Sequence, residues 1–313
     1  MHYARELLPH ATPRSGGWLA KLDLEFARRG ERSVLSKRLH QGPLLVQRAF
    51  YPEASDVAHV YLLHPPGGVV GGDELVLSVN VHSEARALLT APGATKLYRC
   101  PNQPSRIQQR LTVEAGAQLE WFPQETIVFS GARCGSQLHV DLHTRPHTAL
   151  PVFIGWDIIA LGRPGSLAPF ESGELVSGFA VHVDAEPLLT ERLEVCGGSP
   201  ILEAAWGLRG APVLGNFCAS ALGVSGARTA ALVEECRQLC VREYPDRPNE
   251  WKGLTALGQA RSVGASAPPF GCIVARYLGD SAERAKRWMT ALWRIVRPVL
   301  LGREACVPRI WAT

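Results

Sequence analysis

Alternation of apolar and polar residues with a period of two is the main pattern in the first two-thirds of the chain. In the segment 75–81, every second position is apolar: Leu75, Leu77, Val79 and Val81. Such alternation is typical of a strand with one buried face and one solvent face. Similar apolar segments predict further strands at 107–113, 119–122, 126–129 and 138–142. Turn dipeptides separate them, among them Pro92-Gly93, Ser130-Gly131 and Gly197-Gly198.

Helical spacing of apolar residues is found only toward the C-terminus. Residues 227–244 show it and are followed by Pro245 and Pro248, which predicts a helix that stops there. A second helix is predicted after Asp280, which we expect to act as N-cap with Glu283 at the third helical position. Its apolar stripe consists of Ala285, Trp288, Met289, Leu292, Ile295, Val296 and Val299. The arginines between these residues are expected to face away from the core.

Glycine and proline are frequent, with 30 and 23 among 313 residues. Breaks at short intervals favour many short strands over long helices. No repeat of fixed period and no convincing domain boundary is visible, although 245–269 is the most loop-like stretch. The sequence therefore predicts a mainly β protein, a single domain over residues 1–313 of many short strands, with a few helices towards the C-terminus.

Charge and hydropathy exclude several classes of protein. The net charge of +4 is too small to indicate a nucleic-acid-binding protein. No stretch approaches the roughly 20 apolar residues of a membrane span. The polar N-terminal residues 1–17 lack the apolar core of a secretion signal. We therefore expect a cytoplasmic protein that binds neither nucleic acid nor a membrane.

The C-terminal segment 271–313 is basic, with eight Lys and Arg residues against three carboxylates. Such a patch either docks on an acidic protein surface or is a solvated helix face. Arg287 and Arg294 are the candidate docking residues.

The stretch 64–73, HPPGGVVGGD, contains four glycines in six residues. Closely spaced backbone N–H groups can cradle a phosphate, but the Gly-Lys-Ser/Thr ending of a P-loop is missing. A tight turn that needs positive φ or close backbone approach is the favoured interpretation. Whether His64 and Asp73 at its two ends serve a function stays open.

The run 137–143, QLHVDLH, alternates cleanly and places His139, Asp141 and His143 on one face of a strand. Two imidazoles and a carboxylate suit a borderline metal ion such as Ni²⁺ or Zn²⁺. Neighbouring residues of one face lie ~7 Å apart, so a single ion is not easily held by all three. The same residues, with Glu125 as general base, would form a metal-dependent hydrolase, which is the alternative function. A passive nickel store is disfavoured because the ten histidines are dispersed.

Glu125 follows an apolar segment in which a strand would bury alternate residues. A buried carboxylate needs a partner, and Lys96 or Arg99 is the candidate. A structural ion pair and a functional site are both open for this residue.

The chain resembles the urease accessory protein UreD (UreH) family over nearly its whole length. The motifs that carry the resemblance, in order, are Gly17-Trp18, 42–52 (GPLLVQRAFYP), 64–73 (HPPGGVVGGD), 92–99 (PGATKLYR), 119–126 (LEWFPQET), Gly155-Trp156, 161–163 (LGR) and 308–311 (PRIW). The motif residues that we mark for a structural or functional role are His64, Gly67, Gly68, Gly71, Gly72, Lys96, Arg99, Gln124 and Arg163. Two positions depart from the family pattern: Ala168 stands where an acidic residue is common, and Asp157 where glutamate is usual.

The resemblance implies a β-rich, non-enzymatic scaffold or chaperone for urease maturation. It implies a complex with UreF and, through it, the GTPase UreG, docked on apo-urease during nickel insertion. No cofactor is then permanently bound, and nickel is in transient contact at most. Carboxylates suit such transit because their contacts with the ion are weak and exchangeable. We mark Asp73, Glu125, Glu171 and Glu174 as candidates for an interior nickel route. The alternative is structural: Asp73 caps the glycine-rich turn and Glu125 pairs with Lys96.

Overall fold

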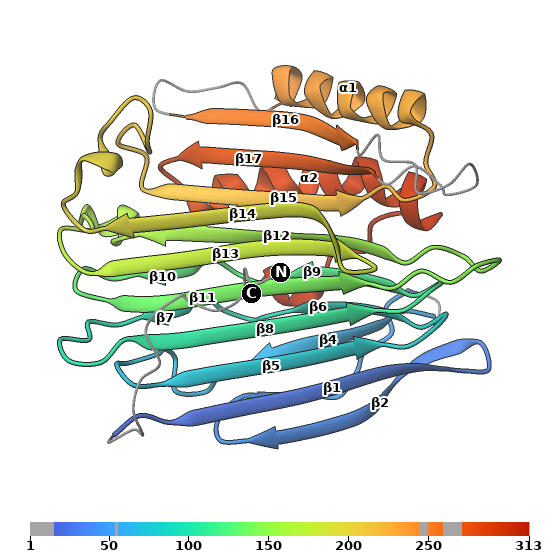
Figure 1. Ribbon diagram of the computed structural model, residues 1–313, viewed down its shortest axis with the longest axis horizontal. Helices are drawn as coiled ribbons and strands as arrows, with labels where there is room; N and C mark the ends of the chain where they lie inside the picture. The colour runs from blue at the N-terminus through green and yellow to red at the C-terminus, as the bar shows by residue number, and fades with distance from the viewer. Residues whose placement is uncertain (1–15, 54–55, 244–249, 259–270, 313) are drawn as a thin grey trace.

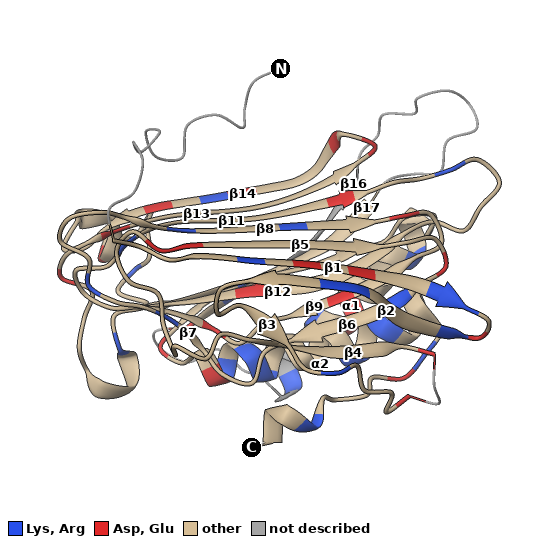
Figure 2. Cartoon of the chain, turned by 90° about the horizontal axis from the view of Figure 1, so that it is seen from below, with Lys and Arg blue, Asp and Glu red and all other residues tan. Residues whose placement is uncertain are grey.

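The computed structural model describes residues 16–53, 56–243, 250–258 and 271–312. In this part of the chain, two β-sheets stack face to face and two α-helices pack on the second sheet (Figures 1 and 2). The predicted mainly β fold with helices towards the C-terminus is confirmed.

The first sheet has seven strands and is called the outer sheet because no described element covers one of its faces, which is called the uncovered face below. Its spatial order is β14 (Glu186–Cys196), β13 (Glu174–Val183), β11 (Arg133–Leu142), β8 (Ser105–Val113), β5 (Glu74–Val81), β1 (Leu19–Arg29) and β2 (Arg32–Gln41). The five central strands are parallel, and β14 and β2 are antiparallel edge strands.

The second sheet has ten strands and is called the middle sheet because it lies between the outer sheet and the helices (Figure 2). Its order is β16 (Trp251–Gly258), β17 (Gly271–Gly279), β15 (Val213–Ser220), β12 (Val152–Leu161), β9 (Gln118–Phe122), β6 (Arg86–Thr90), β4 (Ala58–Leu63) and β3 (Leu45–Val46). Two short strands, β7 (Thr95–Leu97) and β10 (Thr126–Val128), pair with each other beside β12.

The chain alternates between the sheets from β4 to β13. It runs from β4 to β5, β6, β8, β9, β11, β12 and β13, so successive long strands lie in opposite sheets and all neighbours within a sheet are parallel. This winding of the chain between the two sheets, called the coil below, explains the sequence pattern. Strands of the outer sheet alternate cleanly because one face is in water, whereas β12 in the middle sheet reads VFIGWDIIAL because both faces are covered.

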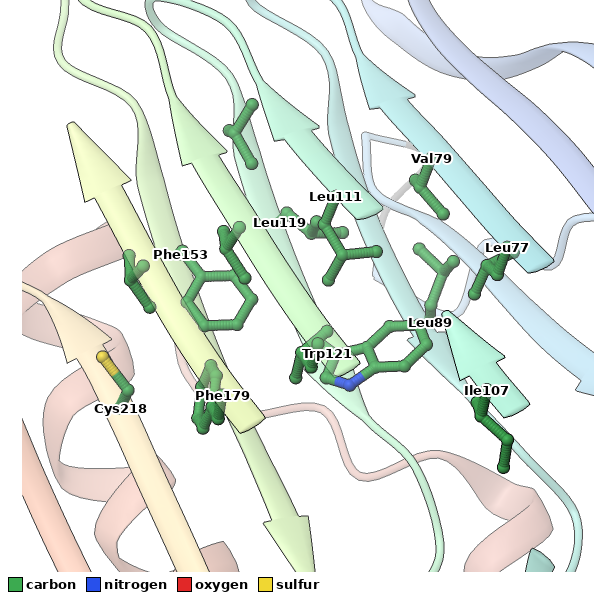
Figure 3. Close-up of a cluster of buried hydrophobic side chains, with 14 of the residues drawn as sticks. Leu77, Val79, Leu89, Ile107, Leu111, Leu119, Trp121, Phe153, Phe179 and Cys218 are labelled. Carbon is green, nitrogen blue, oxygen red and sulfur yellow. The ribbon is translucent and has the colours of Figure 1, made fainter. Parts of the chain in front are cut away.

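Two apolar clusters result from this layering. The first lies between the sheets, where Leu77, Leu111, Leu119, Phe153 and Phe179 meet (Figure 3). The second lies between the middle sheet and the helices and contains Trp156, Phe217, Trp288, Leu292 and Trp293. Strand β12 contributes alternate residues to both clusters.

The predicted strands are found with slightly longer bounds in β5, β8 and β9 and with a shorter one in β10, whereas β11 is twice as long as the predicted strand 138–142. The prediction for 245–269 is wrong in part, because β16 lies within this stretch and pairs with β17. Its remaining residues lie outside the described part, except Glu250.

Helix α1 (Gly226–Glu243) agrees with the predicted helix, of which Tyr244 and the prolines after it lie outside the described residues. Helix α2 (Ala282–Leu301) is capped by Ser281, whose hydroxyl oxygen accepts from the backbone N–H of Arg284. The predicted cap Asp280 is therefore wrong by one residue. The capping serine leaves Glu283 in the first turn, where a carboxylate is favoured by the helix dipole. Neither described helix combines the length and apolar character that a membrane crossing requires.

Three short 3₁₀ turns complete the described elements: η1 (Pro164–Ser166), η2 (Pro200–Leu202) and η3 (Arg309–Ala312). The last one brings Trp311 onto the second cluster, where its ring lies 5.5 Å from that of Trp156 and its Nε1 donates to Thr90 Oγ1 over 2.8 Å. The C-terminal motif thus packs on the helix-covered face of the middle sheet.

Candidate functional site

Several of the family motifs, namely 64–73, 92–99 and the ends of 119–126 and 161–163, lie at one edge of the sandwich. The chain crosses from the middle to the outer sheet four times at this edge, through the loops 64–73, 91–104, 123–132 and 162–173 (left side of Figure 1). These four loops are called the loop edge. At the opposite edge, the turns 82–85 and 114–117 are much shorter. Sequence positions far apart are therefore neighbours at the loop edge because the coil brings each crossing back to it.

The glycine-rich stretch is a compact turn packed on the next loop. Gly67 and Gly72 have φ of 76° and 85°, the left-handed region that glycine adopts at little cost. A Cβ on Gly68 would lie 2.2 Å from the Tyr98 ring, and one on Gly71 would lie 2.7 Å from Cys100 Cβ. The expected positive φ and close approach are both present. The close approach at Gly68 and Gly71 is to the protein's own Tyr98 and Cys100, so packing within the protein explains these two glycines.

Asp73 is buried and fixes this turn. One carboxylate oxygen accepts from the backbone N–H of Trp18 and the other from that of Val70, both over 2.9 Å. Both oxygens are therefore used by backbone donors. This geometry is the capping role that the sequence left open.

A cavity of about 310 Å³ lies between the two sheets behind the loop edge. Apolar side chains from both sheets line its interior, including Leu75, Ile107, Trp121 and Leu138. Its polar lining consists of the backbone of Gly67 and Gly68 and of the residues His64, Thr95, Lys96, Gln108, Gln109, Gln124, Thr126, Ser136 and Asp157. Five of the marked motif residues, namely His64, Gly67, Gly68, Lys96 and Gln124, therefore meet on one cavity.

Asp157 is the one carboxylate in this lining. It faces the space between the sheets, and burial raises the pKa of its carboxyl group to about 6, although the backbone N–H of Ile158 partly opposes the shift. A second cavity of about 180 Å³ is also lined by Asp157, together with Glu191, Asn216, Arg276 and Tyr277. Asp157 thus lies where the two cavities meet.

The end of the cavity at Gln124 is called its mouth, and polar contacts there connect the cavity to α2. Gln124 donates through Nε2 to the Ala91 carbonyl over 2.9 Å and accepts through Oε1 from Lys286 Nζ over 2.6 Å. Lys286 also lies 4.6 Å from the centre of the Trp311 ring. Burial lowers the pKa of Lys286, and the charge of Glu125 partly restores it. The mouth is therefore held by the loop 123–132 and α2 together.

Glu125 is half-buried beside this mouth but does not line the cavity. Among the described residues, no ion pair within 4.0 Å joins it to Lys96 or Arg99, so the expected pairing is wrong. The charged residue whose burial-lowered pKa is partly restored by the charge of Glu125 is Lys286 on α2. The sequence could not show this because α2 is about 160 residues away along the chain.

The remaining candidates lie elsewhere at the loop edge. Arg99 is exposed and lies against Gly131, and Arg163 lies 5.5 Å from the Phe129 ring. Glu171 is exposed, and Glu174 at the start of β13 is 3.6 Å from Arg133. Strands β8 and β11 separate β13 from β5, so Glu174 is roughly 14 Å from Asp73 across the sheet. The four carboxylates marked for nickel transit do not form one cluster.

A fully buried ion cluster fixes α2 to the middle sheet, and the sequence interpretation missed it. Arg297 donates to Glu120 through Nε and Nη2, each over 2.9 Å, and to Glu53 over 2.7 Å. Trp293 Nε1 donates to the same Glu120 over 2.6 Å. The prediction that the arginines of this helix all face away is wrong for Arg297, whose side chain is 0% exposed. The carboxylate that required a buried partner is Glu120, not Glu125.

On the uncovered face of the outer sheet, His139 and Asp141 meet a third residue. His139 Nε2 is 2.8 Å from Asp141 Oδ1, and His182 of β13 lies opposite Asp141. His143 lies beyond the end of β11 and is exposed. The cluster therefore differs from the set His139, Asp141 and His143 considered from the sequence, because the adjacent strand supplies a histidine that a single strand cannot show.

The comparisons with known proteins agree with one another. The family model described as UreD urease accessory protein matches residues 19–312. The urease accessory protein UreD of Alcanivorax borkumensis is 42% identical over 307 residues, which cover 97% of this chain and 95% of that protein. The corresponding protein of Dechloromonas aromatica is 41% identical, with 98% and 99% covered, and that of Aliivibrio fischeri is 40% identical, with 98% and 100% covered.

Proposed function

Because this chain belongs to the UreD urease accessory protein family, we propose that it is a non-enzymatic scaffold that acts on apo-urease during its maturation. The family match over residues 19–312 is the observation that carries the proposal. Urease accessory proteins are maturation factors rather than enzymes. The loop edge, where the family motifs meet on a cavity, is the part of this molecule that we assign to that role.

We propose that UreF binds this chain directly, that UreG joins through UreF, and that the assembly docks on apo-urease in the cytoplasm. The glycine-rich turn lacks the P-loop ending, so GTP hydrolysis is assigned to the GTPase partner. Co-expression with the two partners and urease, followed by size-exclusion chromatography, tests the assembly. Elution of this chain apart from both partners and from apo-urease would contradict it.

Nickel is proposed as a transient cargo rather than a resident cofactor. The cavity supports this idea because, among the described residues that line it, only His64 offers an imidazole and only Asp157 a carboxylate, and two such ligands hold Ni²⁺ less tightly than a closed cage of His and Cys. Glu125 beside the mouth stays a candidate for the entrance. Asp73 is used by backbone donors, and Glu171 and Glu174 lie away from the cavity, so the geometry favours them less.

Two neutral variants test the route, namely Glu125→Gln and Asp157→Asn, with the exposed Glu171→Gln as matched control. If these carboxylates contact the ion in transit, each variant assembles with its partners but yields urease with reduced nickel content, measured by elemental analysis of purified urease. The control gives full nickel content. Full nickel loading with both variants would remove Glu125 and Asp157 from the route without affecting the assembly proposal.

The hydrolase alternative loses its geometric basis. Its residues His139 and Asp141 lie on the uncovered face of the outer sheet, whereas Glu125 lies beside the middle sheet at the loop edge. A general base must reach the reacting water within about 3 Å or through one bridging water. We expect the purified chain to turn over neither urea nor GTP. A stoichiometric GTPase rate from the isolated chain would contradict the scaffold.

A further inference from the structure

Three metal-ligating side chains meet on the uncovered face of the outer sheet, away from the cavity. His139 and Asp141 belong to β11 and His182 to β13, which pair in parallel. One potential ligand atom from each lies within 4.8 Å of the others. Their neighbours Leu138, Val140 and Val181 are buried between the sheets, so the three polar side chains point to the opposite face.

The two imidazoles are arranged as a pair. Their ring centres are 4.5 Å apart with an angle of 18° between the ring planes. His182 Nδ1 is shielded from solvent and has no hydrogen-bond partner among the described residues. A shielded imidazole nitrogen without a partner costs free energy, and a bound cation would offset that cost.

The donor atoms of the cluster suit a cation. Each histidine offers an imidazole nitrogen, and Asp141 offers a carboxylate oxygen. Two imidazoles and one carboxylate therefore lie within reach of one ion.

We propose that His139, Asp141 and His182 bind one divalent first-row transition-metal ion on the outer sheet. Imidazole nitrogen with one carboxylate suits borderline ions such as Zn²⁺, Ni²⁺, Co²⁺ or Cu²⁺, and it does not suit Mg²⁺ or Ca²⁺, which require oxygen ligands. Water fills the other coordination positions because the face is uncovered. Metal–nitrogen bonds of about 2.1 Å need ligand atoms roughly 3–3.5 Å apart, which small side-chain rotations achieve from the observed arrangement.

One neighbouring charge opposes the ion. Arg110 Nε on β8 lies 4.0 Å from Asp141 Oδ2, and its side chain is 71% exposed. The guanidinium competes with a cation for this carboxylate, so removal of its charge is expected to tighten binding. The proposed site lies on a different face from the loop edge and does not depend on the maturation function.

The test uses tag-free, chelator-treated full-length chain and the metal ions alone. Equilibrium dialysis with Ni²⁺ or Zn²⁺ is compared for the wild type, His139→Gln, Asp141→Asn, His182→Gln, Arg110→Gln and the control His143→Gln. His143 is the matched control because it follows the same strand but lies outside the cluster. Circular dichroism confirms that each variant is folded, and Cu²⁺ electron paramagnetic resonance counts the coordinating nitrogens.

We expect each ligand variant to weaken binding of one ion at least tenfold, the control to change it less than twofold, and Arg110→Gln to tighten it two- to fivefold. The wild-type Cu²⁺ spectrum should show two coordinating nitrogens, and either histidine variant should lose one. Equal binding by wild type and His182→Gln, or equal loss in the His143→Gln control, would overturn the proposal. If ligand variants fail to fold, a wild-type spectrum without two nitrogens overturns it on its own.

Discussion

Among the residues of β12, Asp157 has the most unusual environment. It interrupts an apolar strand and faces two cavities, and its departure from the glutamate usual in the family was visible in the sequence. The sequence could not show that the side chain points between the sheets, since both faces of β12 are covered.

The first prediction concerns the pH dependence of stability. Since the folded-state pKa of Asp157 is about 6 and the ordinary value is 3.8, its favourable contribution is fully present below about pH 4 and is lost as the pH rises through 6. We expect Asp157→Asn to raise the free energy of unfolding at pH 8 relative to wild type, by up to about 3 kcal/mol, and to flatten its change between pH 4 and 7. Urea unfolding at several pH values measures this. Parallel pH profiles of variant and wild type would contradict the shifted pKa.

The second prediction concerns Asp73. An asparagine at this position retains a single oxygen acceptor, so one of the N–H groups of Trp18 and Val70 loses its partner. We expect Asp73→Asn to lower the free energy of unfolding by about 1–3 kcal/mol, measured by urea unfolding. The exposed Glu171→Gln is the control and should stay within about 0.5 kcal/mol of wild type. An unchanged stability for Asp73→Asn would return Asp73 to the functional candidates.

At the scale of elements, α2 carries arginines of two kinds. Arg297 is enclosed by Glu120 and Glu53, whereas Arg294, nearly one turn earlier, is exposed. The amphipathic pattern counted both as polar and placed both in solvent. A helical period reveals which residues share a face, but it does not reveal a carboxylate on a strand that is about 180 residues away.

The third prediction compares these two arginines. Arg297→Met leaves Glu120 buried without its charge partner, so we expect a loss of about 3–5 kcal/mol in the free energy of unfolding, or loss of soluble protein. Arg294→Met is the matched control and should change stability by less than about 1 kcal/mol. Because Glu120 and Arg297 interact directly, the double variant with Glu120→Gln should lose less than the sum of the single variants. Additive losses would contradict the ion cluster.

The same contrast shows which features of the helices and strands could be predicted from the sequence. Strand β5 and helix α2 were predicted closely because their apolar periodicity is local. The parallel pairing of β5, β8 and β11 was not, because neighbouring strands are about 30 residues apart and no local period records their register. The same limit applies to the candidate site. Its motif residues could be identified individually from the sequence, whereas the cavity that brings His64, Lys96 and Gln124 together depends on how the chain winds between the two sheets.

At the scale of the whole molecule, the exposed side of α2 is a charged surface that extends beyond the core (Figure 2). Arg287 and Arg294 are seven residues apart, two helical turns, and so share one face. Arg287 is 2.6 Å from Glu283 in an exposed pair, which contributes little to stability. The surface is therefore free to serve docking.

The fourth prediction tests that use. We expect the double reversal Arg287→Glu and Arg294→Glu to leave thermal unfolding unchanged within a few degrees, but to weaken co-elution with the partner proteins at least tenfold. Raised salt should weaken the wild-type complex in the same direction, because exposed charges are screened. Co-elution that matches wild type would show that this side of α2 is only a solvated face.

The cover on both faces of the middle sheet also determines which amides of the molecule exchange last with solvent. Amide protons exchange with solvent through local opening, and elements covered on both faces open last. The amides of β12 and β9 should therefore be the slowest to take up deuterium, since each strand lies between the outer sheet and the layer of helices. Edge strand β2, exposed along most of its length, should exchange within the earliest times. The middle sheet, which carries Asp157, is thus expected to be the last part of the protein whose amide protons exchange with solvent.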